Sequence, residues 1–490
     1  MRDKYIQTAE SVTEGHPDKL CDTIADTVLD NCLEYDPSAR VACEALATAG
    51  KILVAGEITA KVIPDIPAIV ARTVQKAGYE TEYEIEVITH DQSTDIAEAV
   101  GGDKTASPQQ GAGDQGIMYG YACLETDELL PLPVVLAHRL TRLLTDVRKA
   151  GTIRGLGPDG KAQVSVEYVF GLPSRITSVV ISCQHEPDKT LKDLRREVME
   201  YVVMPALQEL PPDEETEILI NPSGRFVLGG FEADTGLTGR KLMVDTYGGL
   251  VPHGGGALSG KDGTKVDRSG TYMARYIAKN IVAAGLALIV TSPVFLLTAI
   301  AIKREDGGPV FYKQERLTKN GKKFYIHKFR SMRVDAEKDG VARLSSGDND
   351  SRITPVGRII RKIRVDELPQ LLDILAGNLS VVGPRPEREE IALQYEKELP
   401  EFRLRLQAKA GLTGYAQVYG KYNTTPYDKL QMDLMYIANP SFMEDLRICF
   451  ATVKILFMPE STEGVAEGAT TAMGQEAALE EMAATKVEKE

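Results

Sequence analysis

Paired cysteines are missing from this sequence of 490 residues. Its cysteines are scattered, and no two of them form a Cys-x-x-Cys pair. Scattered cysteines exclude a disulfide framework and indicate a reducing, cytosolic environment. Residues 1–14 are polar and carry charge throughout, so we expect no N-terminal signal peptide.

Several signatures of nucleotide and nucleic-acid binding are also lacking. Residues 111–116 and 254–262 are rich in glycine, but neither has the spacing of a Walker phosphate loop or a dinucleotide-binding fingerprint. Residues 303–364 carry 17 Lys and Arg against 8 Asp and Glu, within a chain of net charge −14. Because no aromatic-basic interleaving or zinc-finger spacing accompanies this block, we expect no nucleic-acid partner. A phosphorylated substrate or lipid headgroups would match its charge.

The chain has the length and composition of a folded protein with two to four domains. After Pro17, apolar residues recur at helical spacing, which predicts a first helix. Strands are expected at residues 52–58, 84–88, 164–169 and 178–182. The pattern of alternating helices and strands predicts an α+β, multi-domain fold.

Residues 281–302 carry no charge, and as a helix they would span roughly 33 Å, enough for the core of a bilayer. Pro293 lies in the middle, where proline would break or sharply kink the helix. Lys279 precedes the segment, and Lys303 and Arg304 follow it, which favours both ends staying in the cytosol. We therefore expect a re-entrant helix-break-helix hairpin. A buried core helix is the alternative.

A second helix is expected from Thr354-Pro355 onward, with an apolar stripe beside a dense basic face. Such a helix suits a membrane interface, although an ordinary surface helix has the same pattern. Two adjacent carboxylates follow, Asp366 and Glu367. Adjacent carboxylates repel each other and are useful where a metal ion or a phosphoryl centre is handled. One of them can attack phosphorus while its neighbour holds Mg²⁺. Most such pairs, however, are solvated helix starts.

Several motifs surround this pair: they are residues 308–316, 328–332, 364–370, 382–387 and 411–414. In this order they resemble the bacterial sugar transferase family, the monotopic polyprenol-phosphate phosphoglycosyl transferases. The resemblance implies transfer of a phospho-sugar from a UDP-sugar to polyprenyl phosphate. Asp366 would be the catalytic nucleophile, and Glu367 would support Mg²⁺. Arg364 and Arg385 are candidate phosphate or nucleotide contacts.

The N-terminal half has its own titratable cluster, residues 14–19, at the head of a helix, where an anion is a natural occupant. With the two glycine-rich stretches and residues 236–241, 245–249 and 265–269, it resembles S-adenosylmethionine synthetase, also called methionine adenosyltransferase. That resemblance implies ATP and L-methionine as substrates, Mg²⁺ and K⁺ as cofactors, and a homodimer.

The synthetase resemblance also implies a role for each matching residue. The expected polyphosphate contacts are His16, Lys161, Arg240, Lys241 and Lys265. The expected metal ligands are Asp18 and Asp267 for Mg²⁺ and Glu44 for K⁺. The methionine side would be Glu57 and Gln92, and Asp114 and Asp234 would lie near the adenosine or methionine. Taken singly, each of these charged residues has an ordinary surface position as its alternative, whereas the ordered set favours the functional interpretation.

Together these features predict synthetase-type α/β lobes (1–287), a re-entrant membrane helix (281–302), a small α/β transferase domain (288–458) and an acidic disordered tail (459–490). We expect the synthetase's C-terminal lobe to be missing, and the chain to lie at the cytoplasmic face of the plasma membrane. Cytoplasm is the alternative. Three hypotheses stay open: a transferase with an inactive synthetase remnant, a working synthetase with an anchoring tail, or an inactive product of two joined genes.

Overall fold

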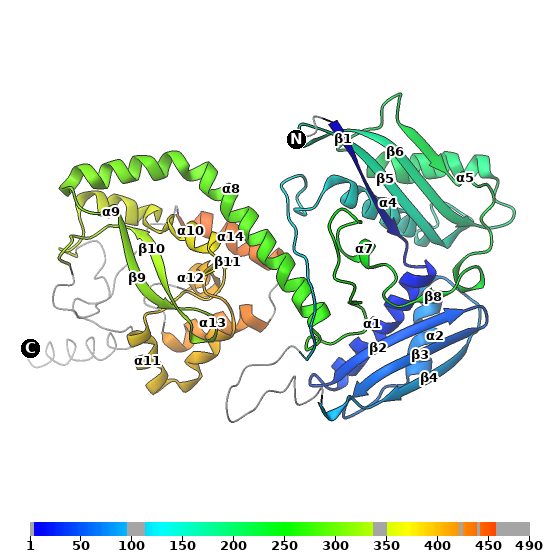
Figure 1. Cartoon of the computed structure of the whole chain (residues 1–490), viewed down its shortest axis with the longest axis horizontal. Coiled ribbons are helices and arrows are strands. Elements are labelled where there is room, and N and C mark those ends of the chain that lie inside the picture. Colours follow the sequence, from blue (N-terminus) through cyan, green and yellow to red (C-terminus); the bar gives the residue numbers. More distant parts are fainter. Residues whose placement is uncertain (1–3, 96–112, 337–349, 421–424, 439–441, 457–490) are drawn as a thin grey trace, which may run out of the picture. The chain divides into compact units, whose positions relative to one another are not determined.

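The protein is described by a computed structural model that covers residues 4–95, 113–336, 350–420, 425–438 and 442–456. The chain divides into two compact units, unit 1 at residues 1–279 and unit 2 at residues 280–490 (Figure 1). Both units mix helices and strands, which confirms the predicted α+β, multi-domain fold. The predicted acidic tail, 459–490, lies outside the described residues.

The first sheet of unit 1 has the strand order β1-β5-β6-β7. These strands are β1 (Lys4–Val12), β5 (Leu156–Val169), β6 (Leu172–His185) and β7 (Glu217–Ile220). Helices α4 (Leu132–Lys149) and α5 (Leu191–Val198) contribute apolar residues such as Leu136, Leu140 and Leu194 to the same core. A π-helical turn (Met199–Val203) and α6 (Met204–Ala206) continue from α5.

The second sheet has the order β4-β3-β2-β8. Its strands are β2 (Arg40–Thr48), β3 (Lys51–Thr59), β4 (Glu84–His90) and β8 (Gly236–Leu237). Helices α1 (Pro17–Tyr35) and α2 (Ile66–Ala77) bury Ile24, Val28 and Val70 in its core. The predicted helix after Pro17 and all four predicted strands are confirmed. Strand β8 pairs with β2 and so brings residues from far along the chain into this sheet.

Helix α8 (Val266–Asp306) is the longest in the structure and contains Pro293. The helix is not interrupted at this proline, so the expected break is not there, although α8 bends along its length (Figure 1). Proline removes one backbone donor and crowds the carbonyl four residues earlier, that of Ile289. The hydroxyl of Ser292 donates to that carbonyl at 2.8 Å, and Thr291 donates to Ala287 O at 2.7 Å. The Ser292 hydroxyl thus supplies a donor to the carbonyl that loses its backbone partner, and the helix continues through the proline.

The apolar part of α8 is long and hydrophobic enough to cross a membrane, and only 11% of its most apolar window is buried. Ile289, Leu296 and Leu297 are all more than half exposed. Only one face packs on unit 2, through Ala284 and Ile302. The alternative of a buried core helix is therefore wrong, whereas entry into one leaflet stays a prediction.

Unit 2 is built around two small sheets. Strands β9 (Phe311–Leu317) and β10 (Lys323–Phe329) form an antiparallel hairpin, and β11 (Ser380–Val382) and β12 (Gly411–Thr413) pair in parallel. The helices around them are α9 (Pro355–Lys362), α10 (Gln370–Leu375), α11 (Glu389–Glu398), α12 (Tyr415–Tyr419), α13 (Pro426–Ala438) and α14 (Phe442–Leu456). Shorter turns are Lys319–Gly321 and Pro400–Gln407.

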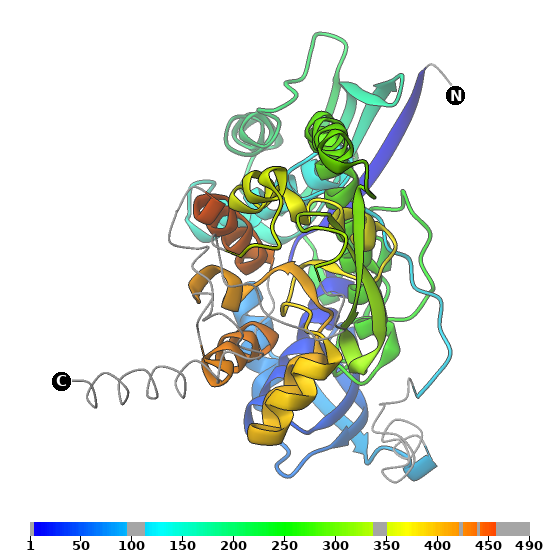
Figure 2. The same cartoon turned by 90° about the vertical axis from the view of Figure 1, so that its left-hand side faces the viewer.

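Within unit 2, α9 and the second half of α8 lie at one end, and α11 and α13 lie at the other (Figures 1 and 2). Helix α9 begins at the predicted place, with Thr354 accepting a hydrogen bond from Gly357 N–H. Its residue Ile359 is 64% exposed. The apolar helix α8 and the basic helix α9 therefore share one end of the unit.

The end of α8 is fastened to β10 by a buried guanidinium. Arg330 is 5% exposed and binds both carboxylate oxygens of Asp306, and its Nε donates to Pro309 O at 2.7 Å. The sequence motif that contains Arg330 thus has a structural role at this position.

We predict that Asp306→Ala destabilises unit 2 by roughly 2 kcal/mol, because a buried guanidinium would lose its charged acceptor. Thermal unfolding of the detergent-solubilised chain measures this effect. The exposed Glu401→Ala serves as control and should leave the transition unchanged. Equal melting of the two variants would contradict the anchoring role of Arg330.

Candidate active sites

The Asp366-Glu367 pair lies on a single 3-10 turn (Val365–Glu367) between α9 and α10. Arg364 precedes it in the left-handed conformation, with φ at 55°, which turns the chain sharply after α9. Val365 and Leu368 pack among apolar residues on either side of the pair. This packing fixes the turn, so the two carboxylates project from a rigid position.

Glu367 is held by two cations from other parts of unit 2. Its Oε1 accepts from Lys328 Nζ at 2.7 Å, on β10, and from Arg385 at 2.9 Å, after β11. Burial by itself would raise the pKa of Glu367, but Arg385 and Lys328 outweigh burial and hold that pKa well below its usual value. Glu367 is therefore a fixed anion in the folded protein.

The pKa of Asp366 is shifted in the opposite direction. Burial raises its pKa to about 6, Lys328 acts against that rise, and the neighbouring Glu367 adds to it. Adjacent carboxylates whose pKa values are pushed apart can take different chemical roles. Glu367 is committed to cations, whereas Asp366 is the carboxylate with capacity for another partner.

Of the two arginines expected to bind phosphate, Arg385 contacts Glu367, and Arg364 precedes the pair in the chain. The charge of Arg364 helps to lower the pKa of both carboxylates. Lys328 was not singled out from the sequence, although it opens the motif at 328–332. Only the pairing of β10 with the turn shows that it belongs to this site.

A second cluster gathers at the N-terminus of α1. His16 caps this helix, and its Nδ1 accepts from Asp18 N–H at 3.2 Å. Burial, followed by the nearby charges of Lys161 and Lys241, lowers the pKa of His16 to about 3, so its ring is neutral. Asp18 accepts from Lys241 Nζ at 2.6 Å, and Arg240 lies 3.5 Å from the same carboxylate.

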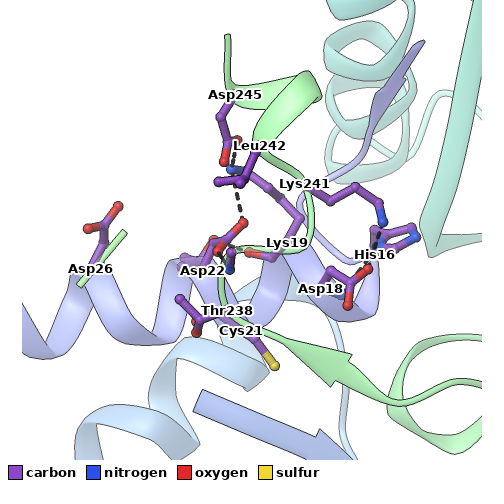
Figure 3. A network of polar contacts seen from close by, with 12 residues as sticks. His16, Asp18, Lys19, Cys21, Asp22, Asp26, Thr238, Lys241, Leu242 and Asp245 are labelled. Atoms are coloured by element: carbon purple, nitrogen blue, oxygen red, sulfur yellow. Dashed lines mark hydrogen bonds and ion pairs between the residues drawn. The ribbon is translucent and has the colours of Figure 1, made fainter. Parts of the chain in front are cut away.

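Beside this cluster, Lys19 connects α1 to α7 (Leu242–Asp245), as Figure 3 shows. Lys19 binds Asp245 and lies 3.4 Å from Asp22, and Asp22 accepts from Gly239 N–H at 2.9 Å. Burial raises the pKa of Asp22 to about 6. The three side chains hold the segment that carries Lys241 against the start of α1.

The start of α8 supplies another part of the predicted site. Lys265 Nζ lies 3.2 Å from Asp262, which also accepts from Val41 N–H on β2 at 2.7 Å and from Thr264 N–H at 2.8 Å. Asp267 accepts from Lys261 Nζ at 2.6 Å. Lys265 and Asp267 are thus each paired within residues 261–267, which follow the second glycine-rich stretch.

The other predicted residues are spread over unit 1. Glu57 lies 3.2 Å from His90, and Gln92 follows β4 with its backbone N–H bound to Thr59 at 2.8 Å. The exposed residues are Glu44 on β2, Asp114, Lys161 on β5 and Asp234. The loop that follows Gln92 lies mostly outside the described residues.

Comparison with protein families matches both halves of the chain. Residues 272–459 match the bacterial sugar transferase model. Three S-adenosylmethionine synthetase models match the N-terminal domain at residues 4–100, the central domain at 109–226 and the C-terminal domain at 228–304. The chain joins domains of these two enzyme families.

One expectation is thereby corrected. The synthetase's C-terminal lobe is not missing, because its family model matches residues 228–304. In the structure this segment forms a 3-10 turn (Gly230–Glu232), β8, α7 and α8. Its two-residue strand joins the N-terminal synthetase sheet, so the segment builds no sheet of its own. Both family models match residues 272–304, which lie entirely within α8.

Among the described residues, no group of three or more His, Cys, Asp or Glu side chains could hold a metal ion. This is compatible with Mg²⁺, which usually binds one or two carboxylates together with substrate phosphates. Glu367, whose Oε1 is bound by Lys328 and Arg385, would be the carboxylate of this site that holds Mg²⁺. Glu44 is a single exposed carboxylate and does not by itself make a K⁺ site.

We predict that Lys19→Met destabilises the synthetase part by roughly 2 kcal/mol, because two mostly buried carboxylates would lose their shared cation. Hydrogen exchange in the peptides of unit 1, measured at increasing temperature, reports this loss of stability. Lys76→Met, on an exposed position of α2, is the matched control. A Lys19→Met protein as stable as the control would show that this lysine does not join α1 to α7.

Proposed function

We propose that the chain transfers a phospho-sugar from a UDP-sugar to polyprenyl phosphate at a membrane, as part of glycan or exopolysaccharide synthesis. The observation that carries this proposal is the buried Asp366-Glu367 turn, in which Lys328 and Arg385 fix Glu367 and leave Asp366 as the carboxylate for chemistry. Membership of the sugar transferase family supplies the reaction class.

The proposed reaction has two steps on Asp366. A carboxylate oxygen of Asp366 attacks the phosphorus that carries the sugar, and the bond from that phosphorus to the nucleotide breaks. UMP leaves, and the phosphosugar stays on Asp366. An oxygen of polyprenyl phosphate then attacks the same phosphorus, which breaks the bond to Asp366 and restores its carboxylate. The lipid product carries the sugar on a diphosphate.

The surrounding cations suit this chemistry. The ammonium of Lys328 and the guanidinium of Arg385 lie beside the turn, where they can stabilise negative charge on a diphosphate. Arg364 adds a third positive charge. Mg²⁺, held through Glu367 and donor phosphates, would supply further neutralisation of that charge. Glu367 itself stays anionic because its pKa is held low.

One end of unit 2 supports the proposed membrane location. There, the exposed apolar residues of α8 lie beside α9, whose basic residues can meet lipid headgroups (Figure 2). The polyprenyl acceptor is itself a membrane lipid. We place this end at the cytoplasmic face of the plasma membrane, where a UDP-sugar is available.

Membranes that contain the full chain should convert a radiolabelled UDP-sugar into labelled lipid. Asp366→Asn should lower this rate at least about 1,000-fold, because an amide cannot act as the nucleophile. Glu401→Gln, an exposed carboxylate of unit 2, should keep full activity. Full activity of Asp366→Asn, or no labelled lipid from the unaltered chain with a panel of UDP-sugars, would refute the proposal.

A second function is supported by the cluster on α1. His16, Asp18 and Lys241 lie together at a helix N-terminus, and Lys161 is close enough to affect the pKa of His16. Such a site suits a polyphosphate, because positive charge and helix N–H groups both favour anions. We therefore propose that the synthetase half forms S-adenosylmethionine from ATP and L-methionine.

This second proposal predicts that the chain forms S-adenosylmethionine from labelled methionine and ATP in the presence of Mg²⁺ and K⁺. Lys265→Ala should abolish that product, because the cation expected at the polyphosphate is removed. Lys192→Ala, at an exposed position of α5, should have no effect. Product formation that is unaffected by Lys265→Ala would contradict this assignment, and no product at all would leave the transferase as the chain's activity.

A further inference from the structure

A histidine-carboxylate pair lies beside the transferase site and is not among the residues expected to act there. Asp373 on α10 is 2% exposed. Its Oδ2 accepts from the backbone N–H of His327 at 2.8 Å, and its Oδ1 lies 2.6 Å from Nδ1 of the same histidine. A carboxylate only accepts hydrogen bonds, so Nδ1 carries the proton. Both oxygens of one buried carboxylate are thus used on one residue of β10.

This pair fixes a strand to a helix at a sensitive place. Lys328 follows His327 on β10, and its Nζ is the cation on Glu367. Helix α10, which carries Asp373, begins at Gln370, directly after the turn with the catalytic pair. The pair of Asp373 and His327 therefore joins α10 to β10. The relative position of these two elements decides where the Lys328 ammonium lies.

Apolar contacts also join β10 and α10. Phe324 and Ile326 pack against Leu371 and Ile374 in one cluster. Apolar packing is not directional and tolerates small shifts along a strand, whereas two hydrogen bonds to one carboxylate fix position and direction. The Asp373 carbonyl in addition accepts from Asn378 N–H at 2.9 Å, which fastens the end of α10.

The position of Lys328 matters for both carboxylates. Its charge helps to lower the pKa of Glu367 and acts against the raised pKa of Asp366. Displacement of a catalytic group by about 1 Å can cost about 100-fold in rate. A shift of β10 by that amount would separate the ammonium from the two carboxylates that it serves.

We infer that Asp373 and His327 are a positioning pair of the transferase site, which hold β10 so that Lys328 reaches Glu367. The inference rests on the proposed transferase function. His327 acts in this pair through its Nδ1 and its backbone N–H, which both bind Asp373. Its Nε2 has no part in this role.

Side-chain replacements separate the two ring nitrogens. In His327→Asn the side-chain amide can donate to Asp373 in place of Nδ1, whereas His327→Gln places its amide nearer the position of Nε2. His327→Leu removes both. With the full chain in membranes and a labelled UDP-sugar, His327→Asn should keep kcat within about threefold. His327→Leu should lower kcat about 10- to 100-fold with little change in KM.

Tyr325→Leu is the matched control, because Tyr325 is two residues earlier on the same strand and is 59% exposed. It should not change kcat. If His327→Gln is active while His327→Asn is as impaired as His327→Leu, then Nε2 is the working atom and the inference is overturned. Unchanged kcat in all the His327 variants would overturn it as well.

A second readout does not need activity. Hydrogen exchange of the detergent-solubilised full chain should show faster exchange of β10 in His327→Leu, with His327→Asn close to the unaltered chain. Equal protection in all three would overturn the inference, whatever the transferase assay gives. If the unaltered chain makes no labelled lipid, the transferase function fails, and exchange alone decides whether the pair holds the strand.

Discussion

The hydroxyl of Ser292 donates a hydrogen bond to the carbonyl of Ile289, at the point where Pro293 has no N–H to offer. This hydroxyl takes the place of the missing backbone donor. It lets α8 continue as one helix, whose first part belongs to the synthetase unit and whose remainder packs on the transferase unit. Both family models end or begin inside this helix. The join between two enzyme families is therefore made without a linker, inside an element that has to stay hydrogen-bonded throughout.

Both units hold buried carboxylates in the same way. In each, carboxylates are removed from water and held by cations from distant parts of the sequence. Asp18 is bound by Lys241, and Glu367 is bound by Lys328 and Arg385. A buried carboxylate without such a cation would take up a proton instead. These ion pairs lie at the two places where the proposed reactions handle phosphates.

Much of this organisation could be predicted from the sequence. The helix after Pro17, the strands of unit 1 and the start of α9 follow local patterns, because side-chain period and capping act within a few residues. The motifs around Asp366 also identified the family. The continuity of α8 through Pro293 could not be predicted, because proline's local preference for a break was offset by the hydroxyl of the preceding residue, Ser292. The missing lobe was wrongly inferred, because its matched segment forms helices and one very short strand instead of a recognisable sheet.

The sequence by itself determined which chemistry-bearing residues the chain has and which families they resemble, because motifs are contiguous in the chain. Only the tertiary structure decided which of them meet. Lys328 and Glu367 are far apart in sequence and meet because β10 lies against the Val365–Glu367 turn, whereas His327 and Asp373 meet because β10 also lies against α10. The difference in pKa between Asp366 and Glu367 also arises from the fold, since burial and the placement of two cations separate neighbours that are chemically alike.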